Sequence, residues 1–172
     1  MQNRLIYVKF RTMSKLDGNK NKTVAQNRKA RHDYFILEAF ECGIVLTGTE
    51  IKSVRAGNLN LKDSYASIED GELWLFGMHI SPYEKSSYIK YDPERDRKLL
   101  VHKRELIRLR NKIREKGLTL VPLSVYIKEG RRAKIEMGLA KGKTSHDKRD
   151  AIADREAKVN IGRAIRGKMD DE

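Results

Sequence analysis

The chain has 172 residues, a length that suits one folded domain with appended segments. Its 37 lysines and arginines outnumber its 24 aspartates and glutamates, and the net charge of +13 favours a polyanionic partner such as nucleic acid. No apolar run approaches the length of a membrane span or of a signal-peptide core, so we expect a cytoplasmic protein with no membrane partner.

The positive charge is concentrated in two segments that flank a nearly neutral body. Residues 1–32 carry a net charge of +8 and residues 141–169 one of +5, whereas the long segment between them carries only +3. This distribution is typical of a folded body with disordered basic arms that become ordered on an anionic partner, although solubilising tails give the same pattern. We therefore divide the chain into a flexible arm (1–28), a folded domain (29–142) and a basic tail (143–172).

Short apolar runs rich in β-forming residues predict strands in the first half of the folded domain. The runs "YFILEAF" (34–40) and "GIVLTG" (43–48) predict a hairpin whose turn is formed by residues 41–43. In the next segment, "TEIKSVRAG" (49–57), the apolar residues are three positions apart and an Ala-Gly pair closes the run. That pattern is typical of a short helix.

Two further hairpins and one longer helix are predicted downstream. Residues 62–80 alternate around Asp-Gly at 70–71, and residues 118–140 alternate around Glu-Gly at 129–130. Both dipeptides suit tight hairpin turns. Between these hairpins, residues 102–117 place their apolar side chains on one helical stripe and end in glycine, which predicts a helix.

The predicted elements define a mainly β fold. About six short strands, glycine-bearing turns and two to three short helices favour a small OB-like antiparallel barrel, since closure of the sheet removes exposed strand edges. The basic tail contains many helix-forming residues but too few apolar ones for a continuous stripe. We therefore expect the tail to become helical only on a partner.

The loop and helix from residue 95 to residue 116 are strongly basic. Ten cations lie in this segment: Arg95, Arg97, Lys98, Lys103, Arg104, Arg108, Arg110, Lys112, Arg114 and Lys116. Only three acids oppose them, which is typical of a stripe that follows RNA phosphates, although a solvated helix face has the same composition. Tyr83, Tyr88 and Tyr91 precede the stripe and suit either base stacking or a lid over the barrel.

The stretch "GLAKGKTSHDKRD" (138–150) looks at first sight like a phosphate-binding P-loop. A P-loop needs four residues between its first glycine and Gly-Lys-Ser/Thr, because that arc lets successive backbone N–H groups surround a phosphate. Only three residues separate Gly138 from Gly142. The arc is one residue short, so we do not expect a nucleotide-hydrolysing site.

Residues suited to catalysis or metal binding are sparse. The four histidines are scattered along the chain: His32, His79, His102 and His146. None has metal-ligand spacing and Cys42 has no second cysteine to join it, so we expect no metal and no cofactor. A Gly-x-Ser-x-Gly elbow is missing from the sequence, which favours a binding protein over an enzyme. His102, at the start of the predicted helix, suits either a helix cap or an RNA contact.

Several sequence blocks occur in an order and spacing that resemble one known family. They are "NRKARHDYFI", "GIVLTGTEIKSVRAGNLNLKDSY", "LFGMHISPY", "RKLLVHKREL" and "KGKTSHDKRD". From about residue 24 to residue 166 the chain resembles small protein B, the SsrA-binding protein family of bacterial trans-translation. The resemblance implies an OB-like barrel, without catalysis, that binds the tRNA-like domain of transfer-messenger RNA (SsrA RNA). It also implies delivery of the charged RNA to stalled ribosomes, for rescue and for tagging of incomplete proteins.

The resemblance implies roles for individual residues as well. Matching RNA-binding positions are Arg31, His32, Glu41, Lys98, Leu100, His102, Lys141, Gly142 and Lys143. Matching positions in a ribosome-contacting tail are His146, Asp147, Lys148, Arg149, Arg163 and Ile165. By the same resemblance the tail folds into a helix in the vacant messenger channel, near the decoding centre of the small ribosomal subunit. Elongation factor Tu is then an indirect partner, through the charged RNA.

The alternative from the residues themselves is a general ribosome-associated or single-strand RNA-binding OB module, in which the tail merely adds affinity. The tail also departs from the family pattern. Ala157 stands where some members carry an aromatic residue, and Gly162 and Gly167 lie within the expected helix. Each internal glycine costs about 1 kcal/mol relative to alanine, so we expect a less helical free tail.

Overall fold

The computed structural model describes residues 21–83, 92–144 and 147, which form nine strands and three helices. The strands are β1 (Lys22–Gln26), β2 (Tyr34–Ile44), β3 (Leu59–Asn60), β4 (Tyr65–Glu69), β5 (Glu72–Phe76), β6 (His79–Ile80), β7 (Arg97–Leu100), β8 (Thr119–Lys128) and β9 (Arg132–Gly142). The helices are α1 (Arg28–Asp33), α2 (Gly48–Ala56) and α3 (Lys103–Lys116). The prediction of a mainly β fold with two to three short helices is confirmed.

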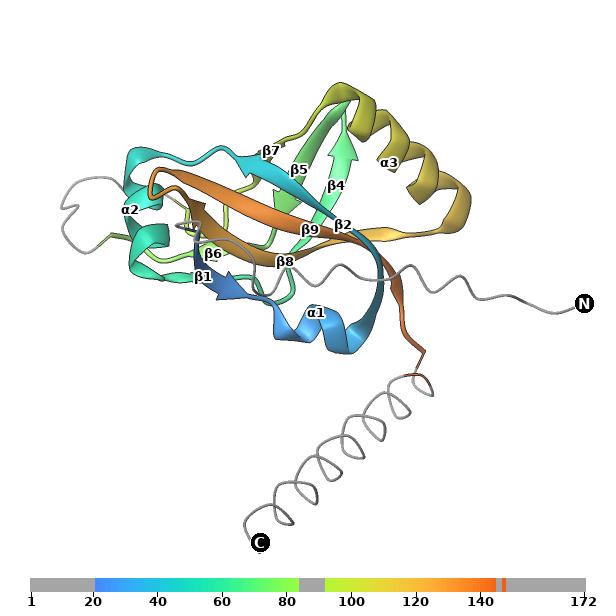
Figure 1. The fold of residues 1–172 in the computed structure, drawn as a ribbon, viewed down its shortest axis with the longest axis horizontal. Helices are drawn as coiled ribbons and strands as arrows, with labels where there is room; N and C mark the ends of the chain where they lie inside the picture. The colour runs from blue at the N-terminus through green and yellow to red at the C-terminus, as the bar shows by residue number, and fades with distance from the viewer. Residues whose placement is uncertain (1–20, 84–91, 145–146, 148–172) are drawn as a thin grey trace, which may run out of the picture.

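Six of the strands form an antiparallel ring. They pair in the order β8-β4-β5-β7-β2-β9, and β9 pairs with β8, so the succession of neighbours returns to its start (Figure 1). The contact between β4 and β8 rests on one residue pair, Ala66 opposite Leu120, whereas β9 pairs with β2 and β8 over most of its length. Outside the ring, β1 adds to β8, and β3 and β6 form a separate two-stranded sheet. This arrangement agrees with the predicted OB-like topology.

Both predicted tight hairpin turns are confirmed. Asp70 and Gly71 have φ angles of 48° and 75° between β4 and β5, and Glu129 and Gly130 have φ angles of 53° and 69° between β8 and β9. Two successive residues with positive φ are typical of type I′ turns, whose twist matches that of the flanking strands. The turns thereby fix the register that sends alternate side chains into the ring.

The predicted hairpin with its turn at residues 41–43 is wrong, because β2 continues through that segment and pairs with β9 along it. The side chains keep strand alternation there: Cys42 is buried inside the ring, whereas Glu41 is exposed outside it. Glycine suits position 43 because of close packing against a neighbouring strand and not because the chain turns there. A Cβ atom at Gly43 would lie 3.1 Å from the Cβ of Leu100 on β7.

The helices α2 and α3 confirm the two helices that the sequence predicts. Thr47 and Glu50 form a capping box at the start of α2, and Gly57 ends that helix in the left-handed conformation. Gly117 ends α3 in the same way, and Leu109 of α3 is completely buried against the core. The two helices lie toward opposite ends of the ring (Figure 1).

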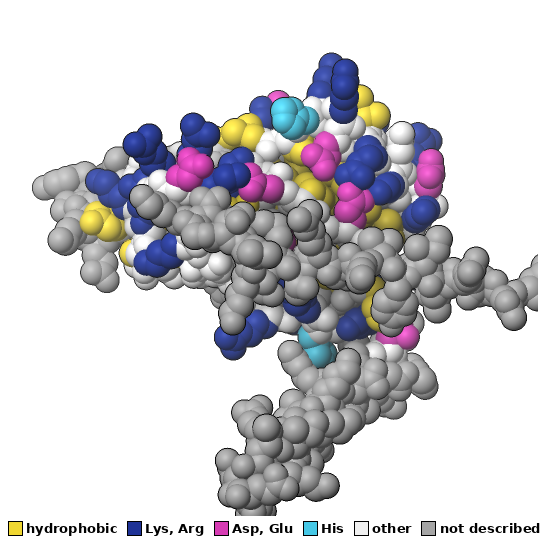
Figure 2. All heavy atoms as spheres, in the orientation of Figure 1, with side chains coloured by type: hydrophobic (Ala, Val, Ile, Leu, Met, Phe, Trp, Pro, Cys, Tyr) yellow, Lys and Arg dark blue, Asp and Glu magenta, His cyan; other side chains and the backbone are white. Residues whose placement is uncertain are grey.

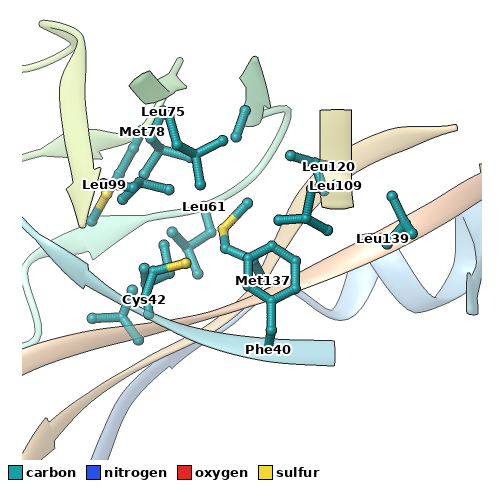
Figure 3. Close-up of a cluster of buried hydrophobic side chains, with 14 of the residues drawn as sticks. Phe40, Cys42, Leu61, Leu75, Met78, Leu99, Leu109, Leu120, Met137 and Leu139 are labelled. Atoms are coloured by element: carbon teal, nitrogen blue, oxygen red, sulfur yellow. The ribbon is translucent and has the colours of Figure 1, made fainter. Parts of the chain in front are cut away.

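One hydrophobic core fills the ring, with contributions from every ring strand and from α2 and α3. Its buried residues are Phe40, Cys42, Val54, Leu61, Ala66, Leu73, Leu75, Met78, Ile80, Leu99, Leu109, Leu118, Leu120, Val125, Ile127, Ile135, Met137 and Leu139. Figure 3 shows how side chains from facing strands meet in this core. Burial of each large aliphatic side chain contributes about 1.5–3 kcal/mol, so this cluster is the main source of stability.

The helix α1 packs on the outside of the ring. Ala30 is buried against a second, smaller cluster that includes Leu123 of β8. Asn27 fixes the helix start: its Oδ1 accepts a hydrogen bond from the N–H of Ala30 at 3.1 Å, and its Nδ2 donates to the carbonyl oxygen of Leu61 at 3.0 Å. The N–H of Asn27 also donates to the carbonyl oxygen of Leu123 at 2.8 Å.

The folded domain begins earlier than the sequence indicates. Residues 22–28, which the sequence assigns to the flexible arm, form β1 and the start of α1. The strand β1 pairs along β8, and none of its residues is fully buried, so it does not need an apolar run. The sequence therefore lacks the signal from which the other strands are predicted. The rest of the predicted arm, residues 1–20, lies outside the described residues.

Candidate nucleic-acid interface

The residues expected to bind RNA fall into two groups near opposite ends of β2. The Glu41 patch consists of Glu41, Lys98, Leu100 and His102, and the α1 patch consists of Arg31, His32, Lys141, Gly142 and Lys143. Tyr34, at the α1 end of β2, is separated from Glu41 by about 23 Å, at about 3.3 Å per residue of extended strand. A single ligand that contacts both patches must therefore be large.

The Glu41 patch is assembled on the outer face of β2 and β7. Gly43 lies opposite Leu100 in the pairing of these strands, and Glu41 projects on the same side two residues earlier. Leu100 is 53% exposed because it points outward, whereas Leu99 points into the core. The patch therefore offers an apolar surface beside a carboxylate.

Three donors from the neighbouring strands hold the carboxylate of Glu41. The hydroxyl of Tyr126 donates to Oε2, and Nζ of Lys134 lies 3.1 Å from Oε1. Nζ of Lys128 lies 3.4 Å from both carboxylate oxygens. Burial opposes ionisation of Glu41, but these hydrogen bonds and the charge of Lys134 outweigh it and hold the pKa of the carboxyl below its ordinary value. Burial and the bond to Glu41 raise the pKa of Tyr126, so its phenol remains a donor.

Lys98 and His102 are the other two polar residues of the Glu41 patch, and each lies two residues from Leu100 along the chain. Nζ of Lys98 forms an ion pair with Glu72 on the adjacent strand β5. His102 is the N-cap residue of α3, yet its exposed side chain makes no capping hydrogen bond. The predicted cap position of His102 is therefore confirmed, but its side chain does not cap the helix, and the RNA-contact alternative stays a prediction.

The α1 patch is organised by the side chain and backbone of Lys143. Its Nζ lies 4.9 Å from the ring centroid of Phe35 and donates to the carbonyl oxygen of Arg31 at 3.2 Å. Its N–H donates to the carbonyl oxygen of Asp33 at 2.9 Å. Within the part of the chain that the structure describes, the side chains of Arg31 and Lys141 have no ion-pair partner. Their charges are available to a ligand.

The Gly-Lys-Thr sequence at 142–144 begins at the last residue of β9, and its threonine is hydrogen-bonded to Asp147. Gly142 is the last residue of β9 to pair with β2. The N–H and the hydroxyl of Thr144 donate to the carboxylate of Asp147 at 2.9 and 2.7 Å, and the N–H of Asp147 donates back to the Thr144 hydroxyl at 3.3 Å. This reciprocal pair is a capping box. The N–H of Thr144, which a P-loop would present to a phosphate, is therefore bonded to Asp147.

The basic segment of residues 95–116 is only partly a surface stripe. Arg97 is completely buried, with Nε donating to Glu50 at 3.0 Å and Nη2 donating to the carbonyl oxygen of Pro93 at 2.9 Å. Arg95 binds the same carboxylate, with Nε 2.9 Å from Oε1. The prediction that Arg97 faces RNA phosphates is therefore wrong, because its charge balances a buried acid.

The helix α3 keeps its remaining cations on the surface. Arg108 and Lys112 form ion pairs with Glu38 of β2, which tie the helix to the ring. Among the described residues, five α3 cations have no ion-pair partner: Lys103, Arg104, Arg110, Arg114 and Lys116. Figure 2 shows Lys and Arg side chains interspersed with acids over the visible face of the ring. The interpretation as an RNA-facing stripe stays a prediction for these five residues.

Several residues singled out in the sequence lie outside the described residues: Tyr88, Tyr91, His146, Lys148, Arg149, Arg163 and Ile165. Tyr83 is described, and Nζ of Lys52 lies 5.5 Å from its ring centroid. The base-stacking role of the tyrosines and the ribosomal role of the tail stay predictions.

Sequence reasoning missed the side chains that hold Glu41 and Arg97. Tyr126, Lys128 and Lys134 alternate outward along the predicted β8–β9 hairpin, so the period of two places them on one face. Their proximity to Glu41 depends on the β2–β9 register, which the sequence does not reveal. Glu50 has a clearer local signal, because Thr-x-x-Glu is the sequence pattern of a capping box.

The described part of the chain contains no helix that is both long enough and apolar enough to cross a membrane. Within the same residues, no three His, Cys, Asp or Glu side chains are grouped so that they could hold a metal ion.

A ring of short antiparallel strands that carries a cationic surface patch is typical of small OB-like domains that bind nucleic acid. The model of one family, described as SmpB protein, matches residues 24–167 of the chain. The chain belongs to this family. The match includes both patches, the ring and most of the basic tail.

Relatives support the same assignment. The SsrA-binding protein of Desulforudis audaxviator is 63% identical over 147 residues, which cover 86% of this chain and 95% of the relative. The SsrA-binding protein of Carboxydothermus hydrogenoformans is 59% identical over 147 residues, with coverages of 86% and 98%. A chain of the solved structure "tmRNA-SmpB: a journey to the center of the bacterial ribosome" is 53% identical, has a TM-score of 0.61, and is matched over 93% of its length and 74% of this chain.

Proposed function

We propose that this protein binds the tRNA-like domain of transfer-messenger RNA and delivers the RNA to stalled ribosomes during trans-translation. It acts as a binding factor and not as an enzyme. The observation that carries the proposal is the match of one family over residues 24–167, which joins the folded ring and the basic tail in a single unit. Relatives named SsrA-binding protein and the likeness to a tmRNA-SmpB structure support it.

The two patches suit a folded RNA better than a short single strand. They lie about 23 Å apart along β2, a distance that a rigid, tRNA-shaped ligand can bridge without stretching. In the α1 patch, Arg31 and Lys141 have no ion-pair partner among the described residues, so their charges suit phosphates. In the Glu41 patch, the carboxylate repels phosphates but accepts hydrogen bonds from base N–H groups or from a ribose 2′-OH. The charges of the α1 patch then supply affinity for the RNA backbone, and the hydrogen bonds of the Glu41 patch supply selectivity for particular bases or riboses.

The basic tail has a separate task in this proposal. Residues 143–172 enter the messenger channel of the small subunit near the decoding centre, and elongation factor Tu takes part through the charged RNA. The capping box of Thr144 and Asp147 supports a helix that begins at this point. The protein works in the cytoplasm, where its RNA and ribosomal partners are.

The proposal is tested by measuring affinity for transfer-messenger RNA, for elongator tRNA and for random RNA of equal length. We expect a clear preference for transfer-messenger RNA. With six to ten phosphate contacts, the logarithm of the binding constant should fall with a slope of about −4 to −9 against the logarithm of salt concentration. Equal affinity for the three RNAs would support the general RNA-binding module instead.

A truncation separates the two tasks. Ending the chain after Thr144 keeps Lys143 in its contacts with Phe35 and Arg31, so the α1 patch remains intact. We expect this variant to bind transfer-messenger RNA nearly as well as the full chain but to support no tagging on stalled ribosomes. A variant that tags normally, or that loses RNA binding as well, would contradict the division between ring and tail.

A further inference from the structure

A small polar cavity lies between α1 and the hairpin of β8 and β9. It has a volume of about 180 Å³ and is bordered by Asn27, Arg28 and Arg31 on one side and by Leu123, Ser124 and Glu136 on the other. Pockets for drug-sized ligands span about 300–1,000 Å³, so this cavity matches one planar base and not a larger molecule. It lies between the two patches, because Arg31 belongs to the α1 patch and Glu136 lies opposite Glu41 on the neighbouring strand.

The carboxylate of Glu136 has acceptor capacity that the described part of the chain does not use. Like charges directly opposite each other on neighbouring strands are unfavourable, and Glu136 faces Glu41 in this way. Glu41 is compensated by Tyr126 and two lysines, whereas Glu136 receives only the hydroxyl of Ser124, at 3.0 Å, among the described residues. An ionised carboxylate has about four acceptor positions. Glu136 can therefore accept further hydrogen bonds from a ligand.

The opposite wall of the cavity supplies positive charge. Arg28 and Arg31 are three residues apart on α1, so their side chains lie on the same side of the helix. Both are exposed, and neither has an ion-pair partner in the described part of the chain. The hydrogen bonds of Asn27 to Leu61 and Leu123 hold this wall in place against the ring. Two guanidinium-bearing residues and the carboxylate-bearing Glu136 thus line the same cavity.

We propose that this cavity is a subsite for one guanine nucleotide of the bound RNA. Arg28 and Arg31 hold its phosphate, and the carboxylate of Glu136 accepts hydrogen bonds from N1–H and the 2-amino group of the base. Guanine fits because its Watson–Crick edge presents two adjacent donors to one carboxylate. Adenine and cytosine present one donor beside a ring-nitrogen acceptor, and uracil presents one donor between two carbonyl oxygens, so each places a lone pair against Glu136. The proposal rests on the proposed RNA-binding function.

Free mononucleotides test the subsite without the large RNA. The full chain, labelled with ¹⁵N, is titrated with 5′-GMP, 5′-IMP, 5′-AMP, 5′-CMP and 5′-UMP, and amide shifts of Leu123, Ser124 and Arg31 are followed. We expect GMP to bind most tightly. IMP keeps N1–H but lacks the 2-amino group, so it should bind about tenfold more weakly, as expected for one partner of a bidentate contact.

Three variants assign the contacts. Glu136→Gln should remove most of the preference for GMP over IMP, and it should fold because it relieves the repulsion of Glu41. Arg31→Met should weaken all five nucleotides by a similar factor, because it removes a phosphate contact. Arg131→Met is the matched control, since Arg131 is exposed in the turn between β8 and β9, outside the cavity and both patches, and has no ion-pair partner in the described residues. This control should leave every nucleotide affinity unchanged.

The outcomes separate this inference from the proposed function. Equal affinities for the five nucleotides, or GMP shifts confined to other amides, would overturn the guanine subsite even if transfer-messenger RNA remains the preferred RNA. Retention of the GMP preference in Glu136→Gln would overturn the role of the carboxylate. Equal affinity of the wild-type chain for transfer-messenger RNA, elongator tRNA and random RNA would overturn the proposed function, whatever the result of the mononucleotide titration.

Discussion

Glu50 and Arg97 form an ion pair in which both side chains are completely buried, with Nη2 of Arg97 2.9 Å from Oε1 of Glu50. The pair joins the first turn of α2 to the start of β7. Its remaining bonding capacity is satisfied as well, because the N–H of Thr47 donates to Glu50 at 2.7 Å and Arg95 donates from the other side. This arrangement explains how a strongly basic segment enters a hydrophobic interior.

Replacing Arg97 by methionine should destabilise the protein strongly. The change leaves the carboxylate of Glu50 in a buried site with one fewer partner, and breaking a buried pair from one side costs about 3–5 kcal/mol. Urea unfolding followed by circular dichroism measures the loss. Lys98→Met is the matched control, because the adjacent Lys98 makes a half-exposed pair with Glu72 and should cost less than about 1 kcal/mol. Equal losses in the two variants would contradict the central role of the buried pair.

The same carboxylate should make stability depend on acid pH. Burial opposes ionisation of Glu50, but hydrogen bonds from Arg95 and Thr47 and the charges of both arginines outweigh it and lower the pKa of its carboxyl from the ordinary 4.5. The folded state therefore releases this proton more readily than the unfolded state. Its stabilisation is fully present above the unfolded pKa and is lost as the pH falls through the folded pKa.

We expect the unfolding free energy of the wild type to decrease as the pH falls below about 4.5, and to decrease less in Glu50→Gln. Some decrease should remain in the variant, since the pKa values of Glu38 and Glu41 are lowered too. Urea titrations at a series of pH values give the two slopes. Identical slopes would contradict a lowered pKa of Glu50, because they would mean that this carboxyl binds its proton equally well in the folded and unfolded states.

The sequence predicts the elements whose signals are local. The turns at 70–71 and 129–130, the stop of α2 at Gly57 and the apolar stripe of α3 each depend on a few neighbouring residues, and each is confirmed. The false turn at 41–43 shows the limit of this reasoning. Gly43 suits a turn when only its neighbours in sequence are considered. In the fold, the position is small because the side chain of Leu100, which is distant in sequence, packs closely against it.

The site is harder to predict than the fold. The family resemblance groups Glu41 with Leu100 and His102, but the donors that hold Glu41 come from β8 and β9 and depend on strand register. Charge counting also treats Arg97 as a surface cation, although it is buried. A net charge says how many cations a segment has, and only long-range packing says which of them remain available to a ligand.

The thiol of Cys42 should be nearly inert in the folded protein. Burial raises its pKa to about 12, so almost no thiolate is present near neutral pH, and its side chain is 1% exposed. A thiol-reactive chromogenic disulfide should therefore react slowly under native conditions at about pH 8 and rapidly in concentrated urea. Fast reaction of the native chain would mean that β2 opens readily at this position.

Gly43→Ala should change RNA binding more than stability. The added Cβ would approach the Cβ of Leu100 to 3.1 Å, and the exposed Leu100 can yield by moving outward. Since Leu100 belongs to the Glu41 patch, its displacement should weaken binding of transfer-messenger RNA by about fourfold, as expected for loss of about one methylene contact. The affinity for random RNA should change little, because no cation is removed.

Gly48→Ala is the matched control for this change. A Cβ atom at Gly48 meets nothing within 4 Å, and the residue is the first of α2, which contributes no residue to either patch. Affinities of both variants for transfer-messenger RNA and random RNA, together with their urea midpoints, complete the comparison. Unchanged affinity of Gly43→Ala at unchanged stability would show that the RNA does not touch Leu100, and the Glu41 patch would then lose its apolar contact.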